Sequence, residues 1–170
     1  DKTGTLTEGR PQLVSIRPIG IDADALAALA AALEQGSEHP IAAAITGYAA
    51  EKELTVPAAA DFAAVFGKGV RARVAGVECA AGNAALLAEL DIPLADAVET
   101  ARAEMAERGE TALIVVRAGR IVGLLGVRDA EKPTSAAAVA QMKAMNLTPV
   151  MLTGDDERTA RAIAARLGIT

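Results

Sequence analysis

Aromatic and sulphur-containing side chains are scarce in this chain, and their scarcity excludes several kinds of site. The 170 residues include no Trp, one Tyr, two Phe and a single cysteine, Cys79. One cysteine cannot form an internal disulfide or a cysteine zinc site. Basic residues are also in deficit, with 17 Lys and Arg against 22 Asp and Glu, a net charge of −5. We therefore expect no nucleic-acid partner, because no basic face is available to bind its phosphates.

Long apolar runs are absent too, although 52% of the residues are hydrophobic. Ala accounts for 41 residues, so the high fraction reflects small side chains rather than a lipid-facing surface. The longest weakly polar run, residues 25–33, is far shorter than the ~20 residues that a membrane-spanning helix needs. A chain of this length predicts one or two compact domains.

Two short motifs near the ends of the chain carry the chemistry. The first is DKTGTLT at residues 1–7, which places the carboxylate of Asp1 at the head of a turn rich in hydroxyls and glycine. Such a carboxylate can attack a phosphoryl group, and Thr3 and the backbone N–H groups of the turn can surround the transferred oxygens. The second is an apolar run that ends in Thr153, Gly154 and Asp155, which predicts further donors to the same phosphate.

Hydrophobic periodicity and capping residues predict alternating helices and strands. Asp22 and Asn83 are expected as N-caps, and Pro40 fits the first turn of a helix. The predicted helices cover residues 22–35, 40–53, 83–90, 94–108, 133–145 and 157–167. The predicted strands cover residues 62–66, 70–74, 77–81, 111–117, 121–127 and 148–152.

The placement of the two motifs predicts the domain organisation. Asp1 and Thr153 must meet at one phosphate, so the intervening meander is most simply an inserted domain. We expect residues 1–17 and 126–170 to form the two segments of a phosphate-handling domain, and residues 18–125 to form the insertion. The helix–strand–helix pattern after residue 133 predicts a parallel sheet, which binds ligands at the carboxyl ends of its strands.

DKTGTLT and TGDD resemble the phosphorylation motifs of the P-type ATPases. These enzymes form an aspartyl-phosphate intermediate, which is a known example of nucleophilic catalysis. SEHP at residues 37–40, GKG at 67–69 and GN at 82–83 are similar to the nucleotide-domain signature of the heavy-metal branch. The resemblance implies a phosphorylation domain of haloacid dehalogenase-like fold, built on a parallel sheet with helices. It also implies an inserted α+β nucleotide-binding domain built on an antiparallel sheet.

The resemblance further implies ATP and Mg²⁺ as cofactors. His39 and Glu34 would hold the adenine, and the carboxylate of Asp1 and the carbonyl of Thr3 would bind Mg²⁺. The wall of the nucleotide pocket would include four residues of the GKG and GN motifs: Gly67, Gly69, Gly82 and Asn83. Taken alone, these residues are more simply a structural histidine, a tight turn and a helix N-cap.

The protein implied by the resemblance is a heavy-metal cation-translocating ATPase, with copper(I) export favoured over zinc. This chain would be a cytoplasmic part of a plasma-membrane protein, with transmembrane and actuator domains as partners and the transported ion bound elsewhere. The family's further magnesium ligand, in a GDGxND segment, and the lysine before it do not occur here. Residues 1–170 alone are therefore expected not to turn over ATP at a pump-like rate.

Two alternatives are a soluble phosphohydrolase of the haloacid dehalogenase type with a cap domain, and a non-catalytic nucleotide-binding module. Phosphohydrolases of that type carry an acid two positions after the nucleophile, where this chain has Thr3. Thr3 cannot transfer a proton, which predicts a slowly hydrolysed acyl-phosphate and disfavours the first alternative.

Overall fold

A computed structural model describes residues 1–155 and 157–169 of the chain. Within them a six-stranded sheet has the order β1-β6-β5-β4-β3-β2, and all neighbouring strands are antiparallel. The strands are β1 (Gln12–Pro18), β2 (Ala59–Val65), β3 (Gly69–Val74), β4 (Val77–Gly82), β5 (Thr111–Arg117) and β6 (Arg120–Arg128). The expected antiparallel sheet is therefore present, whereas the described residues contain no parallel sheet.

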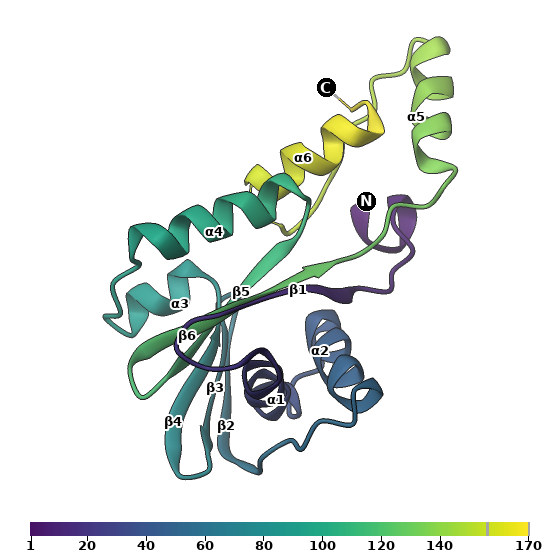
Figure 1. Ribbon diagram of the computed structural model, residues 1–170. Helices are drawn as coiled ribbons and strands as arrows, with labels where there is room; N and C mark the ends of the chain where they lie inside the picture. The colour runs from purple at the N-terminus through teal and green to yellow at the C-terminus, as the bar shows by residue number, and fades with distance from the viewer. Residues whose placement is uncertain (156, 170) are drawn as a thin grey trace.

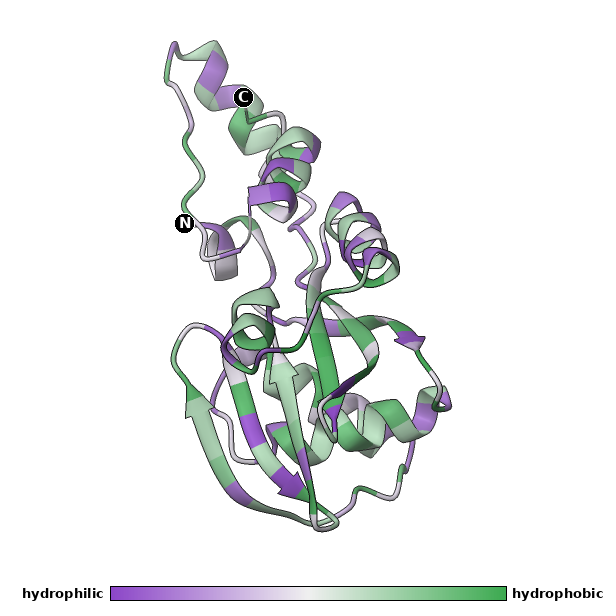
Figure 2. Cartoon of the chain, turned by 90° about the vertical axis from the view of Figure 1, so that its left-hand side faces the viewer, coloured by the Kyte–Doolittle hydropathy of each residue, from purple (hydrophilic) through white to green (hydrophobic). Residues whose placement is uncertain are grey.

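Helices cover both faces of this sheet (Figure 1). One face packs against α1 (Ala23–Glu34) and α2 (Pro40–Glu51), and the other against α3 (Ala84–Glu89) and α4 (Asp96–Glu107). The alternation along β5 explains the two layers, because Leu113 and Val115 join the first core and Ile114 and Val116 the second. Figure 2 shows the apolar colouring along the strands and on the helices that cover them.

Two further helices, α5 (Ser135–Ala144) and α6 (Glu157–Leu167), follow the sheet in sequence. α5 projects away from the sheet, and α6 lies alongside α4 (Figure 1). The ion pair between Arg158 of α6 and Glu99 of α4, at 3.0 Å, joins the two helices. No helix within the described part of the chain is long and apolar enough to cross a membrane.

The predicted caps are confirmed. The Asp22 carboxylate accepts a hydrogen bond from the N–H of Ala25 at 2.9 Å, and the Asn83 side chain accepts from Ala85 and Leu86. Pro40 is the first residue of α2, as predicted. These local signals place the helix starts correctly because a cap needs only residues within one turn.

The predicted strand at residues 148–152 is wrong: this segment is irregular and pairs with no strand in the described residues. Its apolar side chains are exposed, with Val150 at 73% and Leu152 at 69%. The carbonyl of Leu152 accepts a hydrogen bond from the N–H of Lys2, at 3.0 Å. Apolar, β-branched composition favours a strand only where a neighbouring strand completes the ladder.

β1 was missed from the sequence. It is an edge strand that pairs antiparallel with β6 from Gln12 opposite Arg128 to Pro18 opposite Gly123. Its half-exposed pattern contains only a short apolar alternation, and Pro18 stands at its end, where the loss of a donor is tolerated. The sheet thus spans residues 12–128, slightly beyond the expected limits of the insertion at 18 and 125.

Candidate functional site

The DKTGTLT segment folds as one wide turn, η1 (Lys2–Leu6), with the exposed Asp1 at its head. Two of its residues leave helical geometry: Thr3 has φ −70° and ψ 122°, and Gly4 has φ 77°. A positive φ of this size favours glycine, which explains the residue at this position. The turn presents Asp1 to solvent, where a carboxylate is accessible to an incoming phosphoryl group.

Thr7 anchors this turn from inside the protein. Its side chain is fully buried, and its hydroxyl donates to the Asp129 carboxylate at 2.5 Å while accepting from the N–H of Gly4 at 3.2 Å. The same carboxylate accepts from the backbone N–H groups of Gly9 and Arg10. Asp129 therefore accepts hydrogen bonds from three residues, Thr7, Gly9 and Arg10, and closes the chain into a loop at the end of the motif.

The segment that follows Asp129 holds the turn from its other side. The N–H of Lys132 donates to the carbonyl of Leu6 at 3.0 Å, and its ammonium group donates to the carbonyl of Gly4 at 2.8 Å. The Ser135 hydroxyl also donates to Leu6, at 2.8 Å. Two chain segments far apart in sequence thus fix the backbone around Asp1.

The two phosphate motifs meet through Lys2 and Asp155. The Lys2 ammonium lies 2.6 Å from Oδ2 of Asp155, and the two side chains are only 10% and 12% exposed. The hydroxyl of Thr153 donates to the same oxygen at 2.8 Å, and that of Thr111 donates to Oδ1 at 3.2 Å. The Asp155 carboxylate is thereby held by three side chains from three segments.

Gly154 lies between these bound residues and leaves open space, since a Cβ placed on it would meet no atom within 4 Å. Asp1 and Gly154 are both exposed, so the rest of the described chain covers neither of them. Oxygen donors are what Mg²⁺ prefers, and it usually binds one or two carboxylates together with substrate phosphates and water. The Asp1 carboxylate and the Thr3 carbonyl fit that requirement. No group of three or more His, Cys, Asp or Glu side chains able to hold a metal was found in the part of the chain described.

A second group of predicted residues lies at the connection between α1 and α2. Glu34 is only 4% exposed at the end of α1, and burial raises the pKa of its carboxyl, an effect that a hydrogen bond from Ser37 partly offsets. A carboxylate kept in an environment that penalises its charge is a candidate for binding a ligand.

His39 is exposed, and it caps α2 through Nδ1, which accepts from the N–H of Ile41 at 3.2 Å. This bond uses Nδ1 only, and the rest of the exposed ring takes no part in the cap. The structural and ligand-binding roles of His39 are therefore compatible, since they use different parts of the ring.

The GKG and GN motifs are joined to each other. The Asn83 amide donates to the carbonyl of Gly67 at 2.9 Å, and its N–H donates to the carbonyl of Lys68. Gly69 and Gly82 pair across β3 and β4, and a Cβ on Gly69 would approach the Cα of Gly82 to 2.6 Å. Both glycines are thus required by close backbone packing, and the side-chain amide of Asn83 is engaged at both ends.

Gly67 itself lies at an open, exposed surface. A Cβ placed there would meet nothing within 4 Å, and the neighbouring Phe66 is fully exposed. Phe62 of β2 lies against Gly36, so it connects the sheet to the α1–α2 connection that carries His39. The structure therefore links both halves of the predicted nucleotide site to β2.

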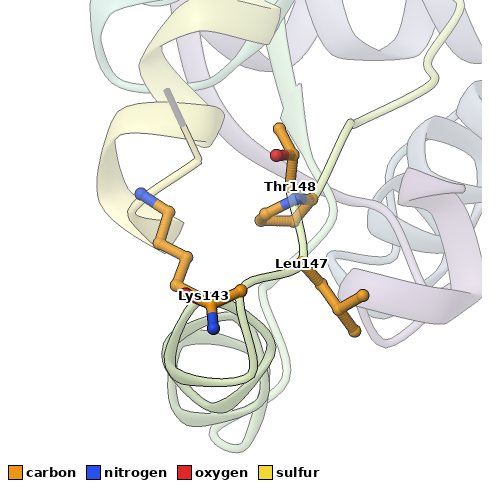
Figure 3. Close-up of a pocket in the computed structure, with 5 residues that line it drawn as sticks. Lys143, Leu147 and Thr148 are labelled. Atoms are coloured by element: carbon orange, nitrogen blue, oxygen red, sulfur yellow. The ribbon is translucent and has the colours of Figure 1, made fainter.

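A depression of the surface lies elsewhere, at the C-terminal end of α5. It has a volume of about 270 Å³ and is lined by Lys143, Asn146, Leu147, Thr148 and Pro149. Figure 3 shows Lys143 and Leu147 pointing in opposite directions from its rim. None of the predicted site residues lines it.

Sequence reasoning missed three residues of the site: Lys2, Thr7 and Thr111. Lys2 and Thr7 lie inside the DKTGTLT motif, so the motif itself was the signal that pointed to them. Thr111 carried no local signal, because it is simply the first residue of a strand. Only the approach of β5 to Asp155 in the folded chain reveals it.

The fold and the paired motifs define a phosphate-handling class of protein, and comparison with known proteins specifies it. The chain belongs to the haloacid dehalogenase-like hydrolase family, which matches residues 1–170. It is 46% identical over 170 residues to the copper-transporting P-type ATPase of Rhizobium leguminosarum bv. viciae, covering 99% of this chain and 20% of that protein. The resemblance to heavy-metal P-type ATPases is confirmed.

Solved structures agree. A zinc-transporting PIB-type ATPase in the E2.Pi state superposes with a TM-score of 0.74 at 38% identity, covering 99% of this chain and 27% of that one. The N-domain of a copper-transporting P-type ATPase matches 67% of this chain and 97% of its own, with a TM-score of 0.57 and 25% identity. The chain spans about a fifth of the length of the curated relatives it matches.

Proposed function

We propose that residues 1–170 form the ATP-binding region and part of the phosphorylation region of a heavy-metal cation-translocating ATPase. In this function Asp1 accepts the γ-phosphoryl group of ATP. The observation that carries the proposal is the Lys2–Asp155 ion pair, which brings the residue next to Asp1 against the TGD motif. This contact holds the backbone beside Asp1 against the loop that contains Thr153 and Gly154, as a shared phosphate would require.

The chain's own residues support a defined phosphorylation step. An oxygen of Asp1 forms a bond to the γ-phosphorus while the bond from that phosphorus to the bridging oxygen breaks, and ADP leaves. The backbone of η1, held by Thr7 and Lys132, keeps Asp1 at the head of the turn. Mg²⁺, bound by the Asp1 carboxylate and the Thr3 carbonyl, would neutralise charge on the transferring group.

Thr3 also favours a pump over a phosphohydrolase. The position two residues after the nucleophile has no group that can activate water, so the acyl-phosphate should hydrolyse slowly. A long-lived intermediate suits transport, because the stored free energy must be coupled to ion movement before it is lost.

The nucleotide site of the proposal lies in the inserted domain. Glu34 and His39 would contact the adenine, and Gly67, Gly69, Gly82 and Asn83 would form the adjoining wall. We place this domain at residues 12–128, because β1 and β6 belong to its sheet. The phosphorylation segments then lie before and after it, close to the limits of 17 and 126 that the sequence predicted.

The remaining properties follow from the relatives as proposals. The relative from Rhizobium is named as a copper transporter, and the PIB-type ATPase of the solved structure as a zinc transporter. We favour copper(I) export, with the transported ion bound in transmembrane segments and this region on the cytoplasmic side of the plasma membrane. Actuator and transmembrane domains of the same pump would be its partners.

Phosphorylation of the full-length protein tests the proposal. Brief incubation with γ-labelled ATP and Mg²⁺ should leave an acid-stable, hydroxylamine-sensitive label, which Asp1→Asn should abolish because the amide is not a nucleophile. Asp24→Asn, which removes an exposed carboxylate from the first turn of α1, should label like the parent. Equal labelling of parent and Asp1→Asn would place the nucleophile elsewhere and overturn the proposal.

A further inference from the structure

Thr111 stands where the central sheet meets the phosphate motifs. It is the first residue of β5, and its hydroxyl donates to Oδ1 of Asp155 at 3.2 Å. The other carboxylate oxygen accepts from Lys2 at 2.6 Å and from Thr153 at 2.8 Å. Thr111 thus supplies a hydrogen bond to one oxygen of the carboxylate, while Lys2 and Thr153 bind the other.

The position of Thr111 is itself braced. The carbonyl of its neighbour Glu110 accepts from the Thr159 hydroxyl of α6 at 3.4 Å. The Glu110 carboxylate, only 4% exposed, binds Ser15 at 2.5 Å and Arg108 at 2.7 Å. These contacts fix the start of β5 against both β1 and α6. Because the backbone at Thr111 is fixed, its hydroxyl holds the Asp155 carboxylate in one orientation.

Strand β5 also connects the two sets of predicted site residues, those for the nucleotide and those for the phosphate. Gly82, in the wall of the proposed nucleotide pocket, pairs with Ile114 of β5. Thr111 lies three residues before Ile114, about 10 Å along an extended strand. β5 therefore runs from the nucleotide-binding motifs to the Asp155 carboxylate.

We propose that Thr111 is a positioning residue for phosphorylation of Asp1, an inference that rests on the proposed function. The Thr111 hydroxyl orients Asp155, Asp155 holds the Lys2 ammonium, and Lys2 fixes the adjoining Asp1 in the turn. Thr111 touches neither nucleotide nor phosphate in this scheme. Its loss therefore slows phosphoryl transfer and leaves nucleotide affinity unchanged.

Single-turnover phosphorylation of the full-length protein at saturating labelled ATP tests this scheme. Thr111→Val keeps the β-branched shape that suits a strand but removes the donor, and we expect phosphorylation about tenfold slower. Thr111→Ser restores the hydroxyl and should come within about threefold of the parent. Thr100→Val, which removes an exposed hydroxyl bonded only within α4, is the matched control and should match the parent.

Two further measurements separate positioning from a general structural role. Calorimetric titration of ATP into residues 1–170 should give dissociation constants within about twofold for the parent and Thr111→Val. Adding Thr111→Val to Asp155→Ala should slow phosphorylation no further than Asp155→Ala alone, because Thr111 acts through the carboxylate. If Thr111→Val folds poorly, Thr111→Ala, which removes the same donor with less bulk, replaces it in each measurement.

The outcomes are distinguishable. Parental phosphorylation rates in Thr111→Val, equal slowing in Thr111→Ser, or weakened ATP binding in Thr111→Val would each overturn the positioning role and leave the proposed function standing. A parent protein that acquires no hydroxylamine-sensitive label would overturn the proposed function and this inference with it.

Discussion

The ammonium group of Lys2 lies 2.6 Å from the carboxylate of Asp155, although 153 positions separate the two residues in the chain. Both side chains are nearly buried, at 10% and 12% exposure. The backbone repeats the contact, because the N–H of Lys2 donates to the carbonyl of Leu152. The pair therefore holds the DKTGTLT segment against the TGD segment, as the proposed function requires.

Removing one partner of this pair should destabilise the protein. Lys2→Met leaves a nearly buried carboxylate without its cation, which we expect to cost about 2–4 kcal/mol of unfolding free energy. Urea denaturation measures it. Arg161→Met breaks the fully solvated pair with Glu157, at 79% and 77% exposure, and should cost less than about 1 kcal/mol. If both variants unfold at the parental urea midpoint, the Lys2–Asp155 contact does not hold the segments together.

Glu110 should make stability depend on pH in the acid range. Burial alone would raise the pKa of its carboxyl, but hydrogen bonds from Arg108 and Ser15 outweigh burial and hold that pKa below the ordinary 4.5. The unfolded state then binds the proton more readily, so the contribution is present above pH 4.5 and is lost as the pH falls through the folded pKa.

Glu110→Gln should therefore flatten the decline of the urea midpoint below pH 4.5. Glu51→Gln, at the exposed end of α2, removes one carboxylate without such partners and should keep the parental profile. Parallel profiles for the parent and Glu110→Gln would show that the carboxylate is not stabilised in the folded state.

Glu34 should show the opposite relationship between charge and stability. Burial raises the pKa of its carboxyl, so the folded state binds the proton better and the charged form weakens folding once the pH exceeds the raised value. Glu34→Gln should therefore raise the urea midpoint at neutral pH. ATP binding should weaken about tenfold in the same variant, because the charged acceptor for the base is lost.

Calorimetry with ATP and urea denaturation together test this opposition between binding and stability. A Glu34→Gln variant that is less stable than the parent and binds ATP equally well would make Glu34 a structural residue. Gln is the matched replacement here, because it keeps the size and one acceptor oxygen and removes the charge.

His39 should contribute to ATP affinity independently of its role as a helix cap. His39→Asn keeps a good N-cap for α2 but removes the ring, whereas His39→Ala removes both. We expect both variants to lose on the order of 1–3 kcal/mol of ATP binding, measured by calorimetry. Only His39→Ala should also lose about 1 kcal/mol of stability.

The same titration on residues 12–128 tests whether the inserted domain binds nucleotide alone. Its sheet and four helices form a unit of the size that folds independently. We expect this domain to bind ATP as the whole chain does. Parental affinity in His39→Asn, or no binding by the excised domain, would contradict the assignment of the pocket.

Much of this architecture was predictable because its signals are local. Asp22, Pro40 and Asn83 mark helix starts through bonds or ring constraints within one turn, and all three were placed correctly. The hairpin of β5 and β6 follows from two β-branched runs around a short turn. Segments 157–167 and 111–117 match their predicted limits.

The failures concern strands whose existence depends on a distant partner. Gln12–Pro18 forms a strand only because β6 offers an open edge, whereas residues 148–152 have the composition of a strand but find no partner strand in the described chain. A one-dimensional pattern contains the propensity of a segment but not the availability of its neighbour.

By itself the sequence determined which groups are available for the proposed phosphorylation. These are a carboxylate at the head of a glycine turn, a second motif expected to meet it, and a threonine rather than an acid at position 3. Tertiary structure alone decided how the two motifs meet. The Lys2–Asp155 pair, the support of Thr111 and the burial of Glu34 each require segments remote in sequence to lie within hydrogen-bond distance or packing contact. Such proximity arises from the packing of the sheet and helices and leaves no local trace in the residues that it joins.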